Sequence, residues 1–374
     1  MTTSGQGDQI LVFDAGTQSI RAALIDLRGE IRHMVKTPIT PYFSRQPGWA
    51  EQELDYYWQC FAATCRRLFD TEGVASDRIA GVTVTSQRAT MVNLDINGTP
   101  LRPAILWLDQ RKAQMKGHLS PLLTGVLKTV NQYGIVDKAI RESKSNWLIQ
   151  NQPDIWEKTH KFLFLSGYWI HRLTGEYRDS VGSQVGYVPF DYKRHCWAGP
   201  RDLKWKFFPM DPTLLPELVP PGGLLGHITR QACQETGIPE GLPVIAAATD
   251  KACEVLGAGC RSPETACLSY GTTATVNTAN PKYVEIKPFV PPYPGALPDT
   301  YNTEAMVYRG FWMVSWFKKE FGLREQQIAA DRGVAPEVIF DELIRDIPPG
   351  SMGLTLQPYG SPGIYTDADA KGAL

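Results

Sequence analysis

The stretch QILVFDAGTQSIRAALID, residues 9–26, decides the fold class. Gln9–Asp14 is a short apolar run, and Ser19–Asp26 alternates apolar and polar residues, which is typical of two strands. The residues between them, Ala15-Gly16-Thr17-Gln18, have the composition of a tight turn. The pattern therefore predicts a β-hairpin near the start of the chain.

A similar pattern returns late in the chain. Thr265–Tyr270 reads as a strand, Gly271-Thr272-Thr273 as its turn, and Ala274–Thr278 as the returning strand. Turns rich in Gly and Thr expose backbone N–H groups and hydroxyls, which bind phosphate oxygens. One such turn is most simply an ordinary turn, but two copies that each begin a domain favour phosphate binding. The sequence has neither a Walker A motif nor GxGxxG, so it is neither a P-loop enzyme nor a dinucleotide-binding fold.

The residues between the two turns predict an α/β arrangement. We expect a third strand at Glu30–Lys36, a helix from Glu51 to Phe69, a strand at Ile79–Thr85 and a strand at Met91–Asp95 that pairs back on it. Acidic residues mark the electropositive start of the helix, namely Glu51, Glu53 and Asp55. The order β-β-β-α-β gives an α/β unit with an antiparallel beginning.

The second half of the chain adds one more strand of interest. Asn146 to Tyr177 is expected to be mainly helical, and Tyr308–Phe321 forms an amphipathic helix. Leu242–Ala248 is a buried strand that leads to Asp250, where a small-residue helix, Lys251–Gly257, begins. Asp250 thus stands at the end of a strand and the start of a helix.

Composition excludes several classes of function. The chain has 374 residues, 43% of them hydrophobic, with 38 Lys and Arg against 39 Asp and Glu, so no basic field favours nucleic acid. No apolar run approaches the roughly 18–20 residues of a membrane span. The seven cysteines form no CxxC pair and the six histidines are scattered, which disfavours disulfide frameworks and transition-metal catalysis. We expect a cytoplasmic globular protein that binds neither nucleic acid nor membrane.

In its motifs and their order the chain resembles the FGGY carbohydrate kinases, such as xylulokinase and glycerol kinase, within the actin-like ATPase superfamily. The matching segments extend over nearly the whole chain: Phe13–Thr17, Pro47–Glu51, Ile105–Arg111, Tyr168–Tyr177, Gly237–Asp250 and Leu268–Thr273. The resemblance implies an α/β, actin-like (ribonuclease H-like) fold of two domains, each with a mixed sheet flanked by helices. The domains would be residues 1–253, with the sugar site and first phosphate loop, and residues 254–374, with the second phosphate loop.

The resemblance also implies an activity and roles for particular residues. The activity is transfer of the γ-phosphate of ATP, with Mg²⁺, to a hydroxyl of a ketose, polyol or related sugar. Asp250 would be the general base, and Asp14 would orient the magnesium ion through water. The two phosphate loops would be formed by Gly16, Thr17, Gln18, Ser19 and Arg21, and by Gly271, Thr272 and Thr273. Residues in the family's sugar-contacting positions are Gln87, Arg88, Trp107 and Asp109.

The residue types leave simpler interpretations open for the charged members of this set. Asp250 suits a helix N-cap, and Asp14 suits a turn at the end of a strand. Arg88 and Asp109 are as well explained by a solvated ion pair as by contact with substrate. Ala89 occupies a position where relatives carry Glu or His, so the resemblance does not identify the sugar.

The end of the chain departs from the family pattern. Residues 356–374 resemble a segment midway through the second domain, and nothing resembles the Gly-rich loop that holds the α-phosphate and adenine. We therefore expect an incomplete second domain and severely reduced nucleotide affinity in this chain. An inactive sugar-binding or regulatory remnant is the alternative, and another actin-like ATPase is a third hypothesis. A homodimer formed through the Tyr308–Phe321 helix is a further expectation, with domain packing as the simpler use of that helix.

Overall fold

The computed structural model describes residues 7–115, 118–270, 274–307 and 310–355. The chain divides into two compact units. The first comprises Met1–Ser262 and Ala279–Thr303, and the second comprises Pro263–Thr278 and Glu304–Leu374. The domain boundary at residues 253 and 254 stays a prediction.

A six-stranded mixed sheet forms the centre of the first unit. Its strand order is β13-β14-β5-β1-β2-β3. The bounds are β1 Gln9–Ala15, β2 Ser19–Asp26, β3 Ile31–Pro38, β5 Ile79–Ser86, β13 Leu224–His227 and β14 Pro243–Ile245. The first three strands are antiparallel neighbours, whereas β1, β5 and β14 run parallel to one another. The predicted hairpin of residues 9–26 is confirmed, and so are the strands expected at Glu30–Lys36 and Ile79–Thr85 within a residue or two.

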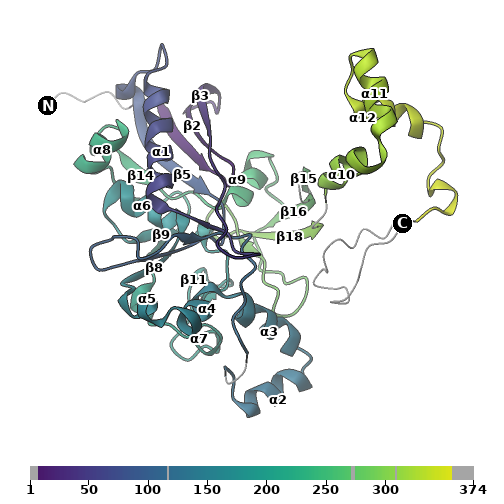
Figure 1. Cartoon of the computed structure of the whole chain (residues 1–374). Coiled ribbons are helices and arrows are strands. Elements are labelled where there is room, and N and C mark those ends of the chain that lie inside the picture. Colours follow the sequence, from purple (N-terminus) through teal and green to yellow (C-terminus); the bar gives the residue numbers. More distant parts are fainter. Residues whose placement is uncertain (1–6, 116–117, 271–273, 308–309, 356–374) are drawn as a thin grey trace. The chain divides into compact units, whose positions relative to one another are not determined.

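Two helices cover one face of this sheet and supply an aromatic core. Helix α1, Leu54–Phe69, packs on β2 and β3, and helix α6, Leu165–Thr174, packs on β5, β13 and β14 (Figure 1). Between them Phe61 and Trp169 stack with ring centroids 5.1 Å apart, and Phe13 of β1 stacks on Phe61 at 4.0 Å. Helix α8, Arg230–Thr236, packs against α1 and α6, and helix α9, Asp250–Gly257, contacts β5. Burial of these rings and of the apolar strand faces fixes the sheet's register.

A second, four-stranded antiparallel sheet has the order β4-β7-β6-β8. Its strands are β4 Glu51–Gln52, β6 Met91–Leu94, β7 Ala104–Ile105 and β8 Lys161–Phe164. The remaining short pairs of the first unit are β9 Arg178–Ser180 with β12 Glu217–Val219, β10 Phe190–Asp191 with β11 Cys196–Trp197, and β17 Tyr293–Pro294 with the start of β18 Tyr301–Val307. Its other helices are α2 Pro121–Thr129, α3 Tyr133–Glu142, α4 Lys144–Asn151, α5 Pro153–Lys158 and α7 Lys204–Phe207.

This second sheet corrects two expectations. The helix predicted from Glu51 begins only at Leu54, because Glu51 lies in β4 and is buried between arginines. The strand at Met91–Leu94 pairs with β7 and β8 rather than back on Ile79–Thr85. Both errors concern pairings between residues distant in sequence. The middle segment is mainly helical as expected, in α4, α5 and α6, and it also contributes the short strand β8 to this sheet.

The second unit begins with an antiparallel pair of strands. Strands β15, Cys267–Tyr270, and β16, Ala274–Asn280, pair as the sequence predicted, while their turn, Gly271–Thr273, lies outside the described residues. Three helices follow, α10 Trp312–Phe321, α11 Leu323–Arg332 and α12 Pro336–Ile344. Helix α10 matches the helix expected at residues 308–321, of which residues 308 and 309 are not described.

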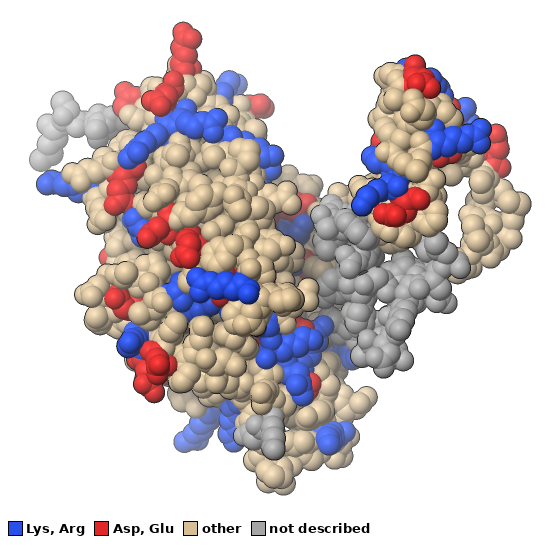
Figure 2. Space-filling model, in the orientation of Figure 1, with Lys and Arg blue, Asp and Glu red and all other residues tan. Residues whose placement is uncertain are grey.

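Charge is mixed rather than segregated on the visible face of the first unit. Figure 2 shows Lys and Arg side chains interspersed with Asp and Glu there, in keeping with the near-zero net charge. Within the described part of the chain, every helix is too short or too polar to span a bilayer.

Candidate active site

Three parallel strands bring the candidate residues to one edge of the main sheet. Asp14 lies near the end of β1, Gln87 and Arg88 directly follow β5, and Asp250 follows β14 after a short connection. Asp14 is in register with Thr85, and Ser86 forms a parallel bridge with Thr249. The carboxyl ends of parallel strands meet at the same edge, where open α/β sheets bind their ligands.

Asp14 and the hairpin turn after it form one side of the site. The Asp14 carboxylate is paired with Arg21, directly opposite it on β2, and both side chains are partly exposed. The turn is closed by the Gly16 N–H, which donates to the carbonyl oxygen of Ser19 at 3.0 Å. Among the described interactions none uses the backbone N–H of Thr17 or Gln18, so both donors are available to an anion.

Asp250 is the first residue of α9 and not its cap. The N-cap is Thr249, whose hydroxyl accepts a hydrogen bond from the Ala252 N–H, so the capping interpretation of Asp250 is wrong. One Asp250 oxygen accepts from the Lys251 N–H at 2.8 Å. Burial raises the pKa of this carboxyl above its ordinary value of 3.8, against the lowering effect of the Lys251 N–H and the Arg88 charge.

The same balance of charges ties Asp250 to Arg88 and Asp14. The Arg88 cation lowers the pKa of Asp250 and the Asp14 carboxylate raises it, so both charges lie within electrostatic reach of Asp250. A raised pKa makes a carboxylate a better proton acceptor, provided that it is ionised at the working pH.

Arg88 is held by aromatic rings that the sequence did not indicate. Its guanidinium lies 5.1 Å from the centre of the Tyr293 ring, which in turn lies 6.3 Å from the partly buried ring of Tyr192. The next residue, Ala89, has a φ of 56°, the left-handed region that costs a residue with a Cβ roughly 1–2 kcal/mol. This turn takes the chain out of the main sheet at β5 and into the second sheet at β6.

Two of the expected sugar contacts are joined to the first turn by hydrogen bonds. The indole N–H of Trp107 donates to the Thr17 hydroxyl at 3.0 Å, and that hydroxyl donates to the Gln87 amide oxygen at 2.8 Å. Half of the Trp107 surface is exposed, 51%, whereas Gln87 is buried. Candidate sugar and phosphate residues therefore form one connected group.

Asp109 has a different environment. Its side chain is fully enclosed and accepts hydrogen bonds from the backbone N–H of Ala50 at 2.7 Å and from Arg111, with Lys144 at 3.5 Å. Burial alone would raise the pKa of Asp109, but hydrogen bonds from Arg111 and Ala50 and the Lys144 charge hold it below 3.8. Asp109 forms its ion pairs with Arg111 and Lys144 inside the protein. The interpretation of Arg88 and Asp109 as a solvated ion pair is therefore wrong.

This buried ion cluster continues to Glu51, which is paired with both Arg102 and Arg111. The Arg111 guanidinium also lies between two indoles, 4.0 Å from the ring centre of Trp49 and 4.6 Å from that of Trp147. The cluster thereby fastens the segment after Trp107 to the Trp49–Glu51 segment and to α4. We interpret it as a scaffold for the exposed Trp107.

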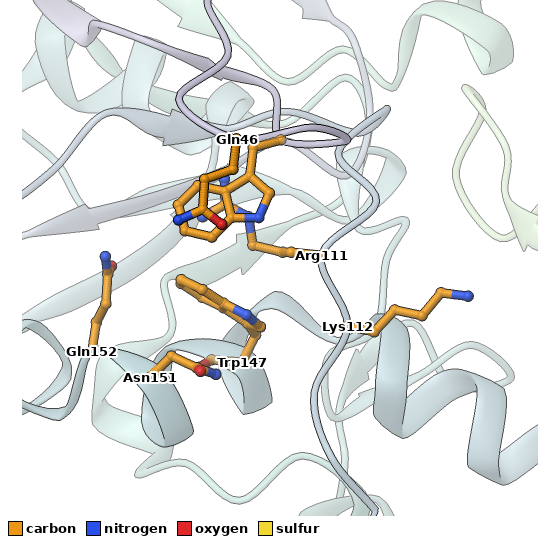
Figure 3. A pocket seen from close by; sticks show the side chains of 7 residues that line it. Gln46, Arg111, Lys112, Trp147, Asn151 and Gln152 are labelled. Carbon is orange, nitrogen blue, oxygen red and sulfur yellow. The ribbon is translucent and has the colours of Figure 1, made fainter.

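Part of this scaffold, including Arg111 and Trp147, lines an open cavity of about 530 Å³ (Figure 3). Its lining consists of indoles, amides and cations, from Gln46, Trp49, Arg111, Lys112, Trp147, Asn151 and Gln152. None of the catalytic, phosphate-binding, metal-binding or sugar-binding residues predicted from the sequence lines it. The chemistry of the strand ends therefore indicates the candidate active site better than the size of this cavity does.

The remaining candidate residues lie in the first turn, in strand β2 and in the second Gly-Thr turn. Ser19 is buried in β2 and Gln18 is exposed in the turn. The second Gly-Thr turn, Gly271–Thr273, lies outside the described residues. Sequence reasoning missed Tyr57, which binds Gln87, and Tyr293, because buried or loop tyrosines carry no local signal of a site.

The protein is therefore of the α/β class, and its candidate site lies at the carboxyl ends of the parallel strands in a mixed sheet. Residues 9–257 match the FGGY family of carbohydrate kinases, N-terminal domain, and the chain belongs to this family. It is 29% identical over 347 residues to the uncharacterized sugar kinase YgcE of Escherichia coli, covering 92% of this chain and 63% of that protein. It is also 24% identical to the xylulose kinase of Lactococcus lactis, covering 97% and 70%.

The solved structures agree on the fold. The crystal structure of xylulose kinase from Rhodospirillum rubrum aligns with a TM-score of 0.77 at 24% identity, covering 94% of this chain and 70% of that one. The expected actin-like α/β fold is thereby confirmed. The chain spans about two thirds of the length of the relatives it matches.

Proposed function

We propose that this chain takes part in ATP-dependent phosphorylation of a ketose, polyol or related sugar. The observation that supports this most is the convergence of Asp14, Arg88 and Asp250 at the ends of three parallel strands. Phosphoryl transfer depends mainly on positioning and on charge neutralisation, which such a group of backbone donors, cations and carboxylates supplies.

In this proposal Asp250 is the general base. Its carboxylate accepts the proton of the sugar hydroxyl as that oxygen bonds to the γ-phosphorus, and the bond from phosphorus to the bridging oxygen breaks to leave ADP. The partly desolvated position of Asp250, which raises its pKa, suits this role. The Arg88 cation opposes that rise and helps to keep the carboxylate ionised at neutral pH.

The first turn would bind phosphate, and Asp14 would hold Mg²⁺ through water. The donors present fit an anion there: the N–H groups of Thr17 and Gln18 are available, and Arg21, which pairs with Asp14, lies on the strand that follows the turn. Mg²⁺ typically binds one or two carboxylates, waters and substrate phosphates, and it would neutralise the charge that develops on the phosphates. Gly271, Thr272 and Thr273 stay the proposed second phosphate loop.

The sugar would lie against the exposed indole of Trp107, between Arg88 and Gln87. The names of relatives, xylulose kinase and L-fuculokinase, suggest small sugars as the first candidates. Since the Asp109 carboxylate is enclosed by Arg111, Lys144 and Ala50, its proposed contribution to the sugar site is to position the Trp107 segment.

The experiment is sugar-dependent release of ADP from ATP with Mg²⁺, over a panel of ketoses, polyols and sugar acids. One substrate that raises ADP release above the sugar-free rate, with loss of that increment in Asp250→Asn, supports the proposal. Asp70→Asn, at the exposed C-terminal end of α1, is the matched control and retains the increment. Sugar binding without ADP release in the wild type would favour a binding remnant instead.

A further inference from the structure

A chain of hydrogen bonds runs from the candidate sugar site into the core of the first unit. The indole of Trp107 binds the Thr17 hydroxyl at 3.0 Å, and Thr17 binds the Gln87 amide oxygen at 2.8 Å. The other end of that amide, Nε2, binds the phenol oxygen of Tyr57 at 3.1 Å. The Tyr57 hydroxyl faces the Pro41 carbonyl oxygen at 3.5 Å. Five residues, each at least 16 positions from the next in sequence, meet in this one chain of hydrogen bonds.

The hydrogen bonds of this chain all run in one direction. An indole N–H is a donor only, so the Thr17 oxygen accepts from Trp107, and the Thr17 hydrogen is directed to the Gln87 amide oxygen. With its oxygen toward Thr17, Gln87 donates from its NH₂ group to the Tyr57 oxygen. The phenol then has its hydrogen left for the Pro41 carbonyl oxygen. Hydrogen bonds aligned in one direction polarise and strengthen one another.

We propose that Tyr57 is a positioning residue for the sugar site: by accepting from Gln87 it sets the orientation of that amide, and through it the Thr17 hydroxyl and the Trp107 indole. This inference deepens the proposed function and rests on it for the identity of the site. Tyr57 does not touch the reacting groups in this account. It acts from helix α1, whose position is fixed by the aromatic core.

Burial gives Tyr57 this influence. Tyr57 is 1% exposed and Gln87 is 3% exposed, so water does not replace either partner readily. Burial also raises the pKa of Tyr57 to about 12, so the phenol keeps its proton at any working pH. Without the hydroxyl, the Gln87 NH₂ group would lose its acceptor, and the amide could turn over and present NH₂ to Thr17. The Thr17 hydroxyl would then lose its acceptor as well.

A second consequence concerns the phosphate turn. While its hydrogen is directed to Gln87, the Thr17 hydroxyl cannot also donate to a phosphate oxygen. Its part in the first phosphate loop would therefore fall to its backbone N–H, with the hydroxyl serving to connect the turn to Gln87 and Trp107.

The test that needs no ligand is a ¹⁵N–¹H spectrum of the ten tryptophan indoles in the intact chain. Trp107→Phe assigns the Trp107 resonance by its disappearance. Thr17→Val removes the direct acceptor, so we expect the Trp107 indole resonance to shift and its N–H to exchange faster, while Thr17→Ser restores the wild-type position. Tyr57→Phe keeps the ring, and hence its ring current, yet should shift the same resonance.

The matched control is Tyr56→Phe, which removes a hydroxyl from the adjacent residue of α1 that binds the Thr40 N–H instead. It should leave the Trp107 resonance unchanged. A Tyr57→Phe spectrum in which Trp107 keeps its wild-type position, while Thr17→Val moves it, would overturn the proposal.

The functional readout is affinity for D-xylulose, measured by calorimetry on the same variants. Loss of one buried hydrogen bond corresponds to a dissociation constant that is roughly five- to tenfold larger. We expect that loss for Tyr57→Phe and none for Tyr56→Phe, and equal affinity in the two variants would count against positioning. If D-xylulose does not bind the wild type, that sugar is excluded for the proposed function, and the resonance test still decides the role of Tyr57.

Discussion

Replacing Asp109 by asparagine tests whether this carboxylate holds the scaffold or touches the substrate. Its oxygens face two cations and two backbone N–H groups: Arg111 at 2.7 and 2.8 Å, Lys144 at 3.5 Å, and the N–H groups of Ala50 and Arg111 at 2.7 and 3.0 Å. An asparagine keeps only one acceptor oxygen, and its NH₂ group would face groups that can only donate, such as the Arg111 guanidinium and the Ala50 N–H. Removing one partner of a buried ion pair typically costs about 3–5 kcal/mol.

The expected loss is large enough to measure directly. For a unit of this size about 1 kcal/mol corresponds to roughly 2–4 °C in the melting temperature, so Asp109→Asn should lower it by about 6–20 °C. Asp137→Asn is the control, because Asp137 makes a surface pair with Arg141 at 2.8 Å that contributes less than about 1 kcal/mol. Thermal unfolding and urea titration of both variants give the comparison. An Asp109→Asn protein that melts within 2 °C of the wild type yet no longer binds sugar would refute the scaffold interpretation.

Three further predictions concern Thr249, Gly182 and Asp179. Thr249→Ala removes the N-cap of α9 and should destabilise the protein by about 1 kcal/mol in urea unfolding; an unchanged midpoint would show that the cap does not matter. Gly182→Ala places a Cβ 2.7 Å from the Cβ of Ala248, so we expect the free energy of unfolding to fall by about 1–3 kcal/mol and the rate of sugar-dependent ADP release to fall as well. Wild-type stability and a wild-type rate in this variant would contradict the prediction. Burial raises the pKa of Asp179 to about 7 in the folded state, above the ordinary 3.8 of the unfolded chain. Between about pH 4 and pH 7 the unfolded chain therefore binds fewer protons at Asp179 than the folded protein does. The free energy of unfolding should fall as the pH rises through this range. Asp179→Asn should flatten that slope in urea titrations, and an equal slope in both proteins would argue against it.

Local patterns predicted the parts of the fold that depend on neighbouring residues. Alternation along Ser19–Asp26 and the Gly16-Thr17 turn were enough for the first hairpin, and the same reasoning gave β15 and β16. The apolar run at Ile79–Thr85 was enough for a central strand. In each case the hydrophobic period and the turn residues specify the element without reference to distant partners.

Distant partners explain what the sequence could not predict. Glu51 resembles the first acidic residue of a helix, and only its pairing with Arg102 and Arg111 places it in a buried strand. Thr249 and Asp250 are both good N-caps, so local preference could not choose between them. Tyr57 looks like any core aromatic on α1, because its hydrogen bond to Gln87 joins residues 30 positions apart.

A comparison of sugar binding with turnover in Asp250→Asn tests whether Asp250 is the general base. A general base contributes typically about 10²–10⁴-fold to the rate, so the variant should lose sugar-dependent ADP release by at least about 100-fold. Its sugar dissociation constant should stay within a few-fold of the wild type, because the amide keeps the size of the carboxyl. Turnover retained within tenfold of the wild type would contradict the assignment of Asp250 as the base.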